Sequence, residues 1–193
     1  MTINLAIESS TTLTEEEYLG FERSSEIKHE YLSGHVYAMV GATRKHNLII
    51  WNVASALHRQ LRGNPCEAYI NDMRVKIPKT GDYTYPDIVV VCETPLLSDD
   101  YSDTLINPLL IIEVLSPSTE AYDRGEKFKR YRSIESFSEY VLIAQDKMAA
   151  DHFVKQNNIW TILEVDQEIR LVTIDCLLTF PEIYDRVELA SEK

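Results

Sequence analysis

Hydrophobic residues concentrate in three short runs, which predict the core strands of one sheet. The runs cover residues 85–91, 109–115 and 139–144, are rich in Val, Ile and Leu, and are bounded by Pro, Ser or Asp. Both faces of the middle run are apolar, yet it carries Glu113. Burying a carboxylate without compensation is strongly unfavourable, so Glu113 must be protonated, paired with a cation or bound to a metal.

Two explanations of Glu113 stay open from this strand alone. One is an interior glutamate in a salt bridge with a neighbouring Arg or Lys, because structural ion pairs perturb buried acids as functional sites do. The other is a site shared with Asp87, which follows Pro86 at the start of an apolar run. An acid after proline is commonly turn chemistry, so the acid on the next apolar strand is what gives Asp87 further weight.

Patterns outside these runs predict the remaining elements. They are a capped helix from Thr14, a hairpin of residues 27–32 and 35–40 around Ser33-Gly34, a main amphipathic helix over 47–62, strands over 66–70 and 73–77, a helix from Ser118 or Thr119 to about Ile134, an antiparallel meander over 152–155, 159–165 and 169–174, and a closing turn over 181–187. His46 precedes the main helix and Glu30 lies in the first hairpin strand, where a polar helix end and an exposed cross-strand charge are the ordinary interpretations. Asp123 and Lys127 form an i,i+4 pair, worth about 0.3–0.5 kcal/mol as an exposed contact.

Composition and charge limit the class of protein. A chain of 193 residues suits a single domain over residues 1–193. With no secretory signature and no apolar run near the ~20 residues that cross a bilayer, we expect a cytoplasmic protein without a membrane partner.

The net charge of −12 argues against a protein that coats nucleic acid. Residues 43–81 nevertheless contain seven basic residues and two acids, so a polyanion can approach this region. Cys66, Cys92 and Cys176 lack metal or redox spacing and are expected to be reduced.

Four motifs follow one another along the chain. They are Tyr85-Pro86-Asp87-Ile88, Ile112-Glu113-Val114-Leu115-Ser116-Pro117, Tyr122-Asp123-Arg124-Gly125-Glu126-Lys127 and Glu139-Tyr140-Val141-Leu142. With the order of helices and strands, they resemble the Uma-two family of restriction-endonuclease-like proteins, a branch of the PD-(D/E)XK nuclease superfamily. The resemblance covers nearly the whole chain. It implies an α/β fold with a restriction endonuclease-like core, in which helices flank a mixed central sheet with an N-terminal hairpin and a C-terminal antiparallel meander.

The resemblance also implies a metal-dependent endonuclease that hydrolyses phosphodiester bonds, in DNA rather than RNA, by a metal-activated water. Asp87 and Glu113 are expected to hold Mg²⁺ or Mn²⁺ as metal ligands and catalytic residues, with the Val114 carbonyl and waters completing an octahedral shell. Glu30 and His46 match family positions beside this site. Glu30 is expected to act as an outer metal ligand, and His46 to contact phosphate or water.

One position departs from the superfamily pattern. The lysine expected two residues after the glutamate is Leu115, so the cation that stabilises the phosphate must come from elsewhere. Lys127 is expected to supply it, since the following helix can return its ammonium to the site and its position matches the lysine of the family's Asp-Arg-Gly-Glu-Lys segment. Lys129 is the second candidate for this cation.

Three functions therefore stay open. The first is the endonuclease, a homodimer where two strands must be cut, which requires Asp87, Glu113 and Lys127 to converge. The second is a catalytically inactive nuclease-fold protein that binds nucleic acid or protein, in which protein donors satisfy Asp87 and Glu113. The third is a metal-dependent hydrolase of small phosphorylated molecules, which would need a narrower pocket than the open groove that duplex DNA requires.

Overall fold

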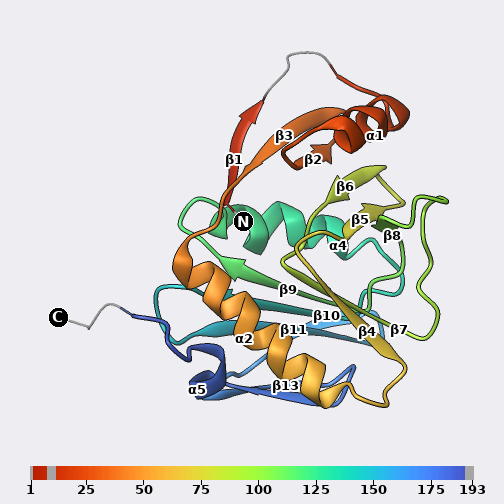
Figure 1. Cartoon of the computed structure of the whole chain (residues 1–193). Helices are drawn as coiled ribbons and strands as arrows, with labels where there is room; N and C mark the ends of the chain where they lie inside the picture. The colour runs from red at the N-terminus through yellow and green to blue at the C-terminus, as the bar shows by residue number, and fades with distance from the viewer. Residues whose placement is uncertain (1, 8–11, 190–193) are drawn as a thin grey trace.

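Two six-stranded mixed sheets and a two-stranded hairpin build the molecule (Figure 1), which is a computed structural model describing residues 2–7 and 12–189, with side chains for 12–39 and 41–189. The first sheet has the order β1 (Thr2–Ile7), β3 (His35–Val40), β2 (His29–Leu32), β6 (Asp82–Thr84), β5 (Arg74–Ile77) and β8 (Thr104–Leu105). The central sheet has the order β12 (Ile159–Leu163), β11 (Ala150–Gln156), β10 (Glu139–Ala144), β9 (Leu110–Leu115), β7 (Ile88–Cys92) and β4 (Cys66–Ile70). The hairpin pairs β13 (Glu168–Leu171) with β14 (Cys176–Thr179).

The three apolar runs form adjacent strands of the central sheet, as predicted. β9 pairs with β10 in parallel and with β7 antiparallel, so this sheet is mixed. Side chains alternate across β9: Ile112 packs on one face with α2, whereas Ile111 and Leu115 pack on the other. Glu113 lies on the same face of β9 as Ile111, so its side chain faces the first sheet.

Helices cover both faces of the central sheet. They are α2 (Arg44–Gln60), α3 (Glu120–Tyr122), the π-helical segment η1 (Asp123–Lys127), α4 (Phe128–Tyr131) and α5 (Phe180–Ile183). A further helix, α1 (Glu15–Ser24), packs on the first sheet instead, where its Tyr18 contacts Tyr31 and Tyr83. α2, α5 and the β13–β14 hairpin cover one face (Figure 1). α4 and β5 of the first sheet pack on the other face, so η1 and α4 lie between the two sheets. No helix among the described residues has the length and apolar character needed to cross a membrane.

Local sequence signals account for the N-terminal elements. The Thr14 hydroxyl accepts a hydrogen bond from the Glu17 backbone N–H (3.3 Å), and the Glu17 carboxylate accepts one from the Thr14 N–H (2.8 Å), which completes the predicted capping box. The β2–β3 turn has φ of 52° at Ser33 and 88° at Gly34. Two left-handed residues give the twist that a two-residue hairpin needs, so the predicted hairpin is confirmed.

Two expectations about the fold are wrong. β11 and β12 extend the central sheet, but β13 leaves it and pairs with β14, because Ile169 and Leu171 bury their side chains against the α2 layer. The C-terminal part is therefore a sheet extension plus a separate hairpin, not one meander. Cys66 and Cys92 form a disulfide, since the β4–β7 register sets them directly opposite each other; Cys176 is a free, buried cysteine.

Candidate active site

Strand register brings the two predicted metal ligands together. β7 and β9 pair Ile88 with Ile112, so Asp87, one residue earlier, lies across from Glu113. The Asp87 backbone N–H donates to Glu113 Oε2 (3.2 Å), and the Val114 N–H donates to Asp87 Oδ2 (2.7 Å). Asp87 is 5% exposed and Glu113 is 3% exposed. The two carboxylates are thus interlocked at one end of adjacent strands and nearly removed from solvent.

Lys127 reaches the same place from the η1 segment. Its ammonium lies 2.8 Å from Glu113 Oε1, 3.4 Å from Glu30 Oε1 and 3.6 Å from Asp123 Oδ1. Lys127 therefore occupies the position that was expected for it beside Glu113. Lys129 lies outside this group: its side chain is 75% exposed, and its ammonium is 3.5 Å from Glu126.

Glu30 and His46 also border the two carboxylates. Glu30 is fully buried, accepting hydrogen bonds from the Tyr85 backbone N–H (3.2 Å) and the Tyr122 hydroxyl (3.3 Å). It is therefore not an exposed cross-strand charge, because its strand faces the central sheet rather than solvent. His46 Nε2 lies 3.2 Å from Asp87 Oδ2, at the first turn of α2.

Two further residues of the site were not foreseen. Asp123 is 4% exposed, so the expectation that it forms an exposed pair with Lys127 is wrong: the helix presents this face to the sheet. The Tyr131 hydroxyl donates to Glu113 Oε1 (3.2 Å) and accepts from the Thr84 hydroxyl (3.0 Å). The spacing of 123, 127 and 131 is the one signal that could have grouped them, because residues four apart share a helix face.

We call these side chains the carboxylate cluster: Glu30, Asp87, Glu113 and Asp123, with Lys127 and His46. Burial is the largest cause that raises the pKa of Glu113 to about 8, and the nearby Asp123 and Asp87 add to it against the Lys127 ammonium. Burial likewise raises the pKa of Glu30 and of Asp123. Burial opposes the charge of Lys127, but the surrounding carboxylates hold its pKa well above the usual value.

Asp87 behaves in the opposite way. Burial favours its neutral form, but the His46 side chain and the Val114 N–H outweigh burial and lower the pKa of Asp87 to about 2. The cluster thus contains one firmly ionised carboxylate directly beside one that tends to hold a proton. Neighbouring carboxyl groups with their pKa values pushed apart are typical of acid–base sites, and of sites that await a cation.

The donor set fits a hard divalent cation. Among the described residues, four buried carboxyl groups lie beside one ammonium and one imidazole, so the carboxyl groups outnumber the basic groups there. Within residues 12–189, no three His, Cys, Asp or Glu side chains are grouped so as to hold a metal ion by themselves. Mg²⁺ commonly binds through one or two carboxylates and completes its shell with water and phosphate oxygens, a requirement that Asp87 and Glu113 meet.

Comparisons with known proteins find relatives along most of the chain. The model of the Uma2 family, described as "Putative restriction endonuclease", matches residues 15–183. Two uncharacterised proteins of Synechocystis sp. are similar: slr1290 is 37% identical over 161 residues (82% of this chain, 83% of that protein), and sll1609 is 33% identical over 151 residues (78% and 85%). The crystal structure of "a putative nuclease belonging to DUF820" from Anabaena variabilis has the same fold, with a TM-score of 0.74 at 18% identity over 91% of this chain and 99% of that one.

Proposed function

Because the chain belongs to the Uma2 family, we propose that it is a metal-dependent endonuclease that hydrolyses phosphodiester bonds in DNA. One observation carries the proposal: Asp87 at the start of β7, Glu113 on β9 and Lys127 on the following helix converge in a buried cluster where, among the described residues, carboxyl groups outnumber basic groups. A satisfied structural salt bridge needs one acid for one base. The surplus of acids is what a divalent cation would neutralise.

Each member of the cluster has a distinct task in this proposal. Asp87 and Glu113 would hold Mg²⁺ or Mn²⁺, which when bound supplies a Lewis acid for the phosphate and lowers the pKa of a water. Lys127 places a fixed positive charge where the phosphate gains negative charge, replacing the lysine absent at Leu115. Glu30 positions the Lys127 ammonium through its 3.4 Å contact.

His46 and Asp123 act on the site indirectly. His46 keeps Asp87 ionised, because its Nε2 lies 3.2 Å from Oδ2 and the pKa of Asp87 is lowered to about 2. Asp123 lies 3.6 Å from the Lys127 ammonium and holds it from the helix side. Both are positioning residues, since neither replaces the two carboxylates as the ligand pair.

Calorimetric titration of Mn²⁺ tests the proposal without knowledge of the DNA sequence preferred. We expect the wild type to bind Mn²⁺ and Glu113→Gln to lose binding. Glu139→Gln is the matched control, since Glu139 is also a buried glutamate of the central sheet but lies outside the cluster. Binding that survives in Glu113→Gln, or that disappears equally in the control, would contradict the proposed site.

A second candidate is a catalytically inactive nuclease-fold protein that binds nucleic acid or protein. The observation that favours it is that protein donors already satisfy both ligands: Asp87 contacts His46 and the Val114 N–H, and Glu113 contacts Lys127 and the Asp87 N–H. The same titration separates the two functions, because the inactive protein would bind no Mn²⁺ in either form. A homodimeric state and a cytoplasmic location stay predictions.

A further inference from the structure

A pocket of about 450 Å³ on the outer side of the η1–α4 helix gathers basic side chains that the proposed mechanism does not use. Its cationic lining residues are Lys79, Lys129, Arg132 and Lys155, and the other lining residues are Ser133, Asn158 and Trp160. They come from three separate segments: the β5–β6 turn, the α4 helix with the residues after it, and the β11–β12 hairpin. We call this group the basic pocket.

The charges of the basic pocket are poorly neutralised. In the part of the chain that the structure describes, its one ion pair is Lys129 with Glu126, at 3.5 Å and well exposed. Lys155 donates to two backbone carbonyls, those of Glu135 (2.9 Å) and Phe137 (3.2 Å), so its ammonium is held in place without an opposing carboxylate. A fixed ammonium beside other unpaired cations is a ready site for an anion.

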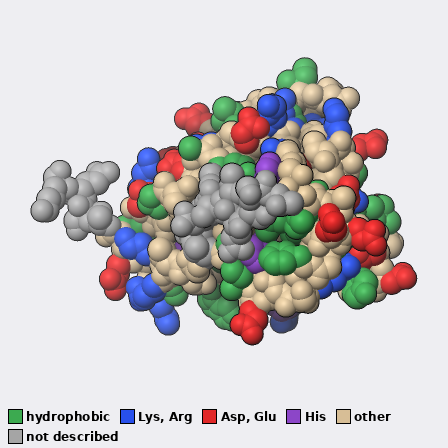
Figure 2. All heavy atoms as spheres, turned by 90° about the horizontal axis from the view of Figure 1, so that it is seen from above, with side chains coloured by type: hydrophobic (Ala, Val, Ile, Leu, Met, Phe, Trp, Pro, Cys, Tyr) green, Lys and Arg blue, Asp and Glu red, His purple; other side chains and the backbone are tan. Residues whose placement is uncertain are grey.

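Other cations of the same helix form ion pairs with carboxylates. Arg124 is paired with Glu120 and Asp151, and Arg130 is paired with Asp82. On the face seen in Figure 2, acidic and basic side chains are interspersed, as expected for a surface of mixed charge. The basic pocket is therefore a local positive region on a protein whose net charge is −12.

Trp160 gives the pocket an aromatic wall beside its charges. Its ring lies 5.1 Å from the rings of both Phe128 and Phe137, which fix it against the core, and the ring is only partly buried. Cations that hold a phosphate backbone, next to a rigid aromatic surface on which a base can stack, are the combination used to bind single nucleic acid strands.

We propose that the basic pocket binds the phosphodiester backbone of a DNA strand, as an anchor separate from the carboxylate cluster. The proposal rests on the proposed function, because it takes DNA as the substrate. Lys127 and Lys129 point to opposite sides of one helix, the first buried in the cluster and the second exposed in the pocket. Pocket and cluster are thus separated by roughly the ~10 Å thickness of a helix, and a strand that passes around this helix engages both.

Trp160 provides a direct reporter, since the chain has two tryptophans and Trp51 can be replaced. In a Trp51→Phe background with EDTA to prevent cleavage, a single-stranded DNA 12-mer is titrated while tryptophan fluorescence is followed. We expect saturable quenching that weakens at least tenfold in Lys129→Glu/Arg132→Glu, with a fall of about 1 to 2 in the slope of log affinity against log salt.

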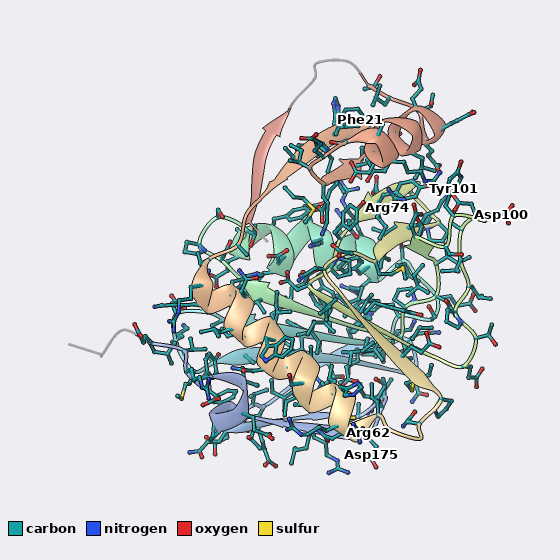
Figure 3. The ribbon with its side chains drawn as sticks, viewed as in Figure 1. Phe21, Arg62, Arg74, Asp100, Tyr101 and Asp175 are labelled. Atoms are coloured by element: carbon teal, nitrogen blue, oxygen red, sulfur yellow. A yellow bond between two sulfur atoms is a disulfide. The ribbon has the colours of Figure 1, made fainter. Side chains whose placement is uncertain are left out.

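The control carries the same change of net charge elsewhere. Arg62→Glu/Arg170→Glu alters two exposed residues of the layer formed by α2 and the β13–β14 hairpin, on the opposite face of the central sheet from α4 and Trp160; Figure 3 labels Arg62 and Asp175, the partner of Arg170. It should bind DNA within about threefold of the parent. Equal weakening in both double variants would overturn the proposal, because general repulsion would then explain the loss. If inorganic phosphate quenches Trp160 equally and displaces the 12-mer, the pocket takes free phosphate and the strand assignment fails.

Plasmid cleavage with Mn²⁺ distinguishes failure of the anchor from failure of the proposed function. Cleavage that depends on Glu113 but is unchanged in Lys129→Glu/Arg132→Glu would leave the function standing and remove the anchor. Saturable DNA binding in the basic pocket, with no cleavage by the wild type, would support the anchor and remove the nuclease. We expect the pocket variants to raise KM at least tenfold and to change kcat less than threefold, because they do not touch the reacting phosphate.

Discussion

Two buried glutamates on neighbouring strands of the central sheet have opposite surroundings. Glu139 on β10 faces the β13–β14 hairpin, and its Oε1 accepts from the Val172 N–H (2.9 Å) and lies 2.6 Å from His152 Nε2. Its Oε2 accepts from the N–H (3.0 Å) and the hydroxyl of Thr173. One acid thus has one imidazole and three other donors, and it fastens the hairpin to the sheet.

Glu113 on β9 faces the other side of that sheet. It shares the Lys127 ammonium with Glu30 and Asp123, and it lies beside the ionised Asp87. Burial is similar in the two cases, so burial alone does not identify a functional acid. The difference is that donors around Glu139 match its charge, whereas carboxylates around Glu113 outnumber the cations.

The largest expected effect concerns cleavage. Glu113→Gln removes one of the two ligand carboxylates and should lower Mn²⁺-dependent cleavage of supercoiled plasmid by about 10³-fold, a magnitude typical of losing one electrostatic contact to the reacting group. Glu139→Gln should stay within about threefold when assayed at a temperature where it is folded. A similar loss in both variants would erase the distinction between the two glutamates.

The next effect concerns stability, where Glu139→Gln and not Glu113→Gln should cause the larger loss. Glu139→Gln should lower the free energy of unfolding by about 3 kcal/mol, because it removes a carboxylate from buried hydrogen-bond donors and turns an amide toward the backbone N–H groups. Glu113→Gln should be neutral or stabilising in EDTA at pH 7.5, since it removes a carboxylate from a cluster that has too many. Urea unfolding of both variants measures this, and strong destabilisation by Glu113→Gln would show that its charge is already compensated.

Much of this arrangement follows from local patterns. The capping box at Thr14, the Ser33-Gly34 hairpin and the apolar runs around Asp87 and Glu113 each depend on residues close in sequence, so they could be predicted. The placement of Lys127 beside Glu113 follows from the resemblance to a family motif, because no local pattern predicts which strand a helix side chain contacts.

Long-range pairing explains what could not be predicted. The burial of Glu30 depends on how a second sheet packs over the first, and the Cys66–Cys92 disulfide depends on the β4–β7 register. The burial of Asp123 does not follow from its sequence, because the same i,i+4 spacing with Lys127 occurs on exposed and buried helix faces. In each case the missing information is which element covers the residue.

A smaller effect is the pH dependence of stability without metal. The pKa of Glu113 is about 8 in the folded state and near 4.5 in the unfolded state. Between these two pH values, Glu113 is protonated in the folded state and ionised in the unfolded state. Stability should therefore fall as pH rises, by about 2 kcal/mol between pH 5.5 and 7.5. Urea unfolding in EDTA measures it. In Glu113→Gln the part of this pH dependence that Glu113 causes should vanish. The contributions of other groups, including Glu30 and Asp123 with their raised pKa values, should remain. Identical pH dependence of the unfolding free energy in the wild type and in Glu113→Gln would contradict the excess of carboxyl groups in the cluster.

The smallest effects come from single hydroxyl donors. Thr173→Val removes one of several donors to Glu139, and it should cost about 1 kcal/mol of unfolding free energy with Mn²⁺ affinity unchanged. Tyr131→Phe removes a donor 3.2 Å from Glu113, and it should change Mn²⁺ affinity several-fold with a similar loss of stability. Titration calorimetry and urea unfolding on both variants separate a hydroxyl that serves the metal site from one that only fastens the hairpin. Equal Mn²⁺ affinities in the two variants would mean that Tyr131 does not tune Glu113, and would confine the site to the carboxylates and Lys127.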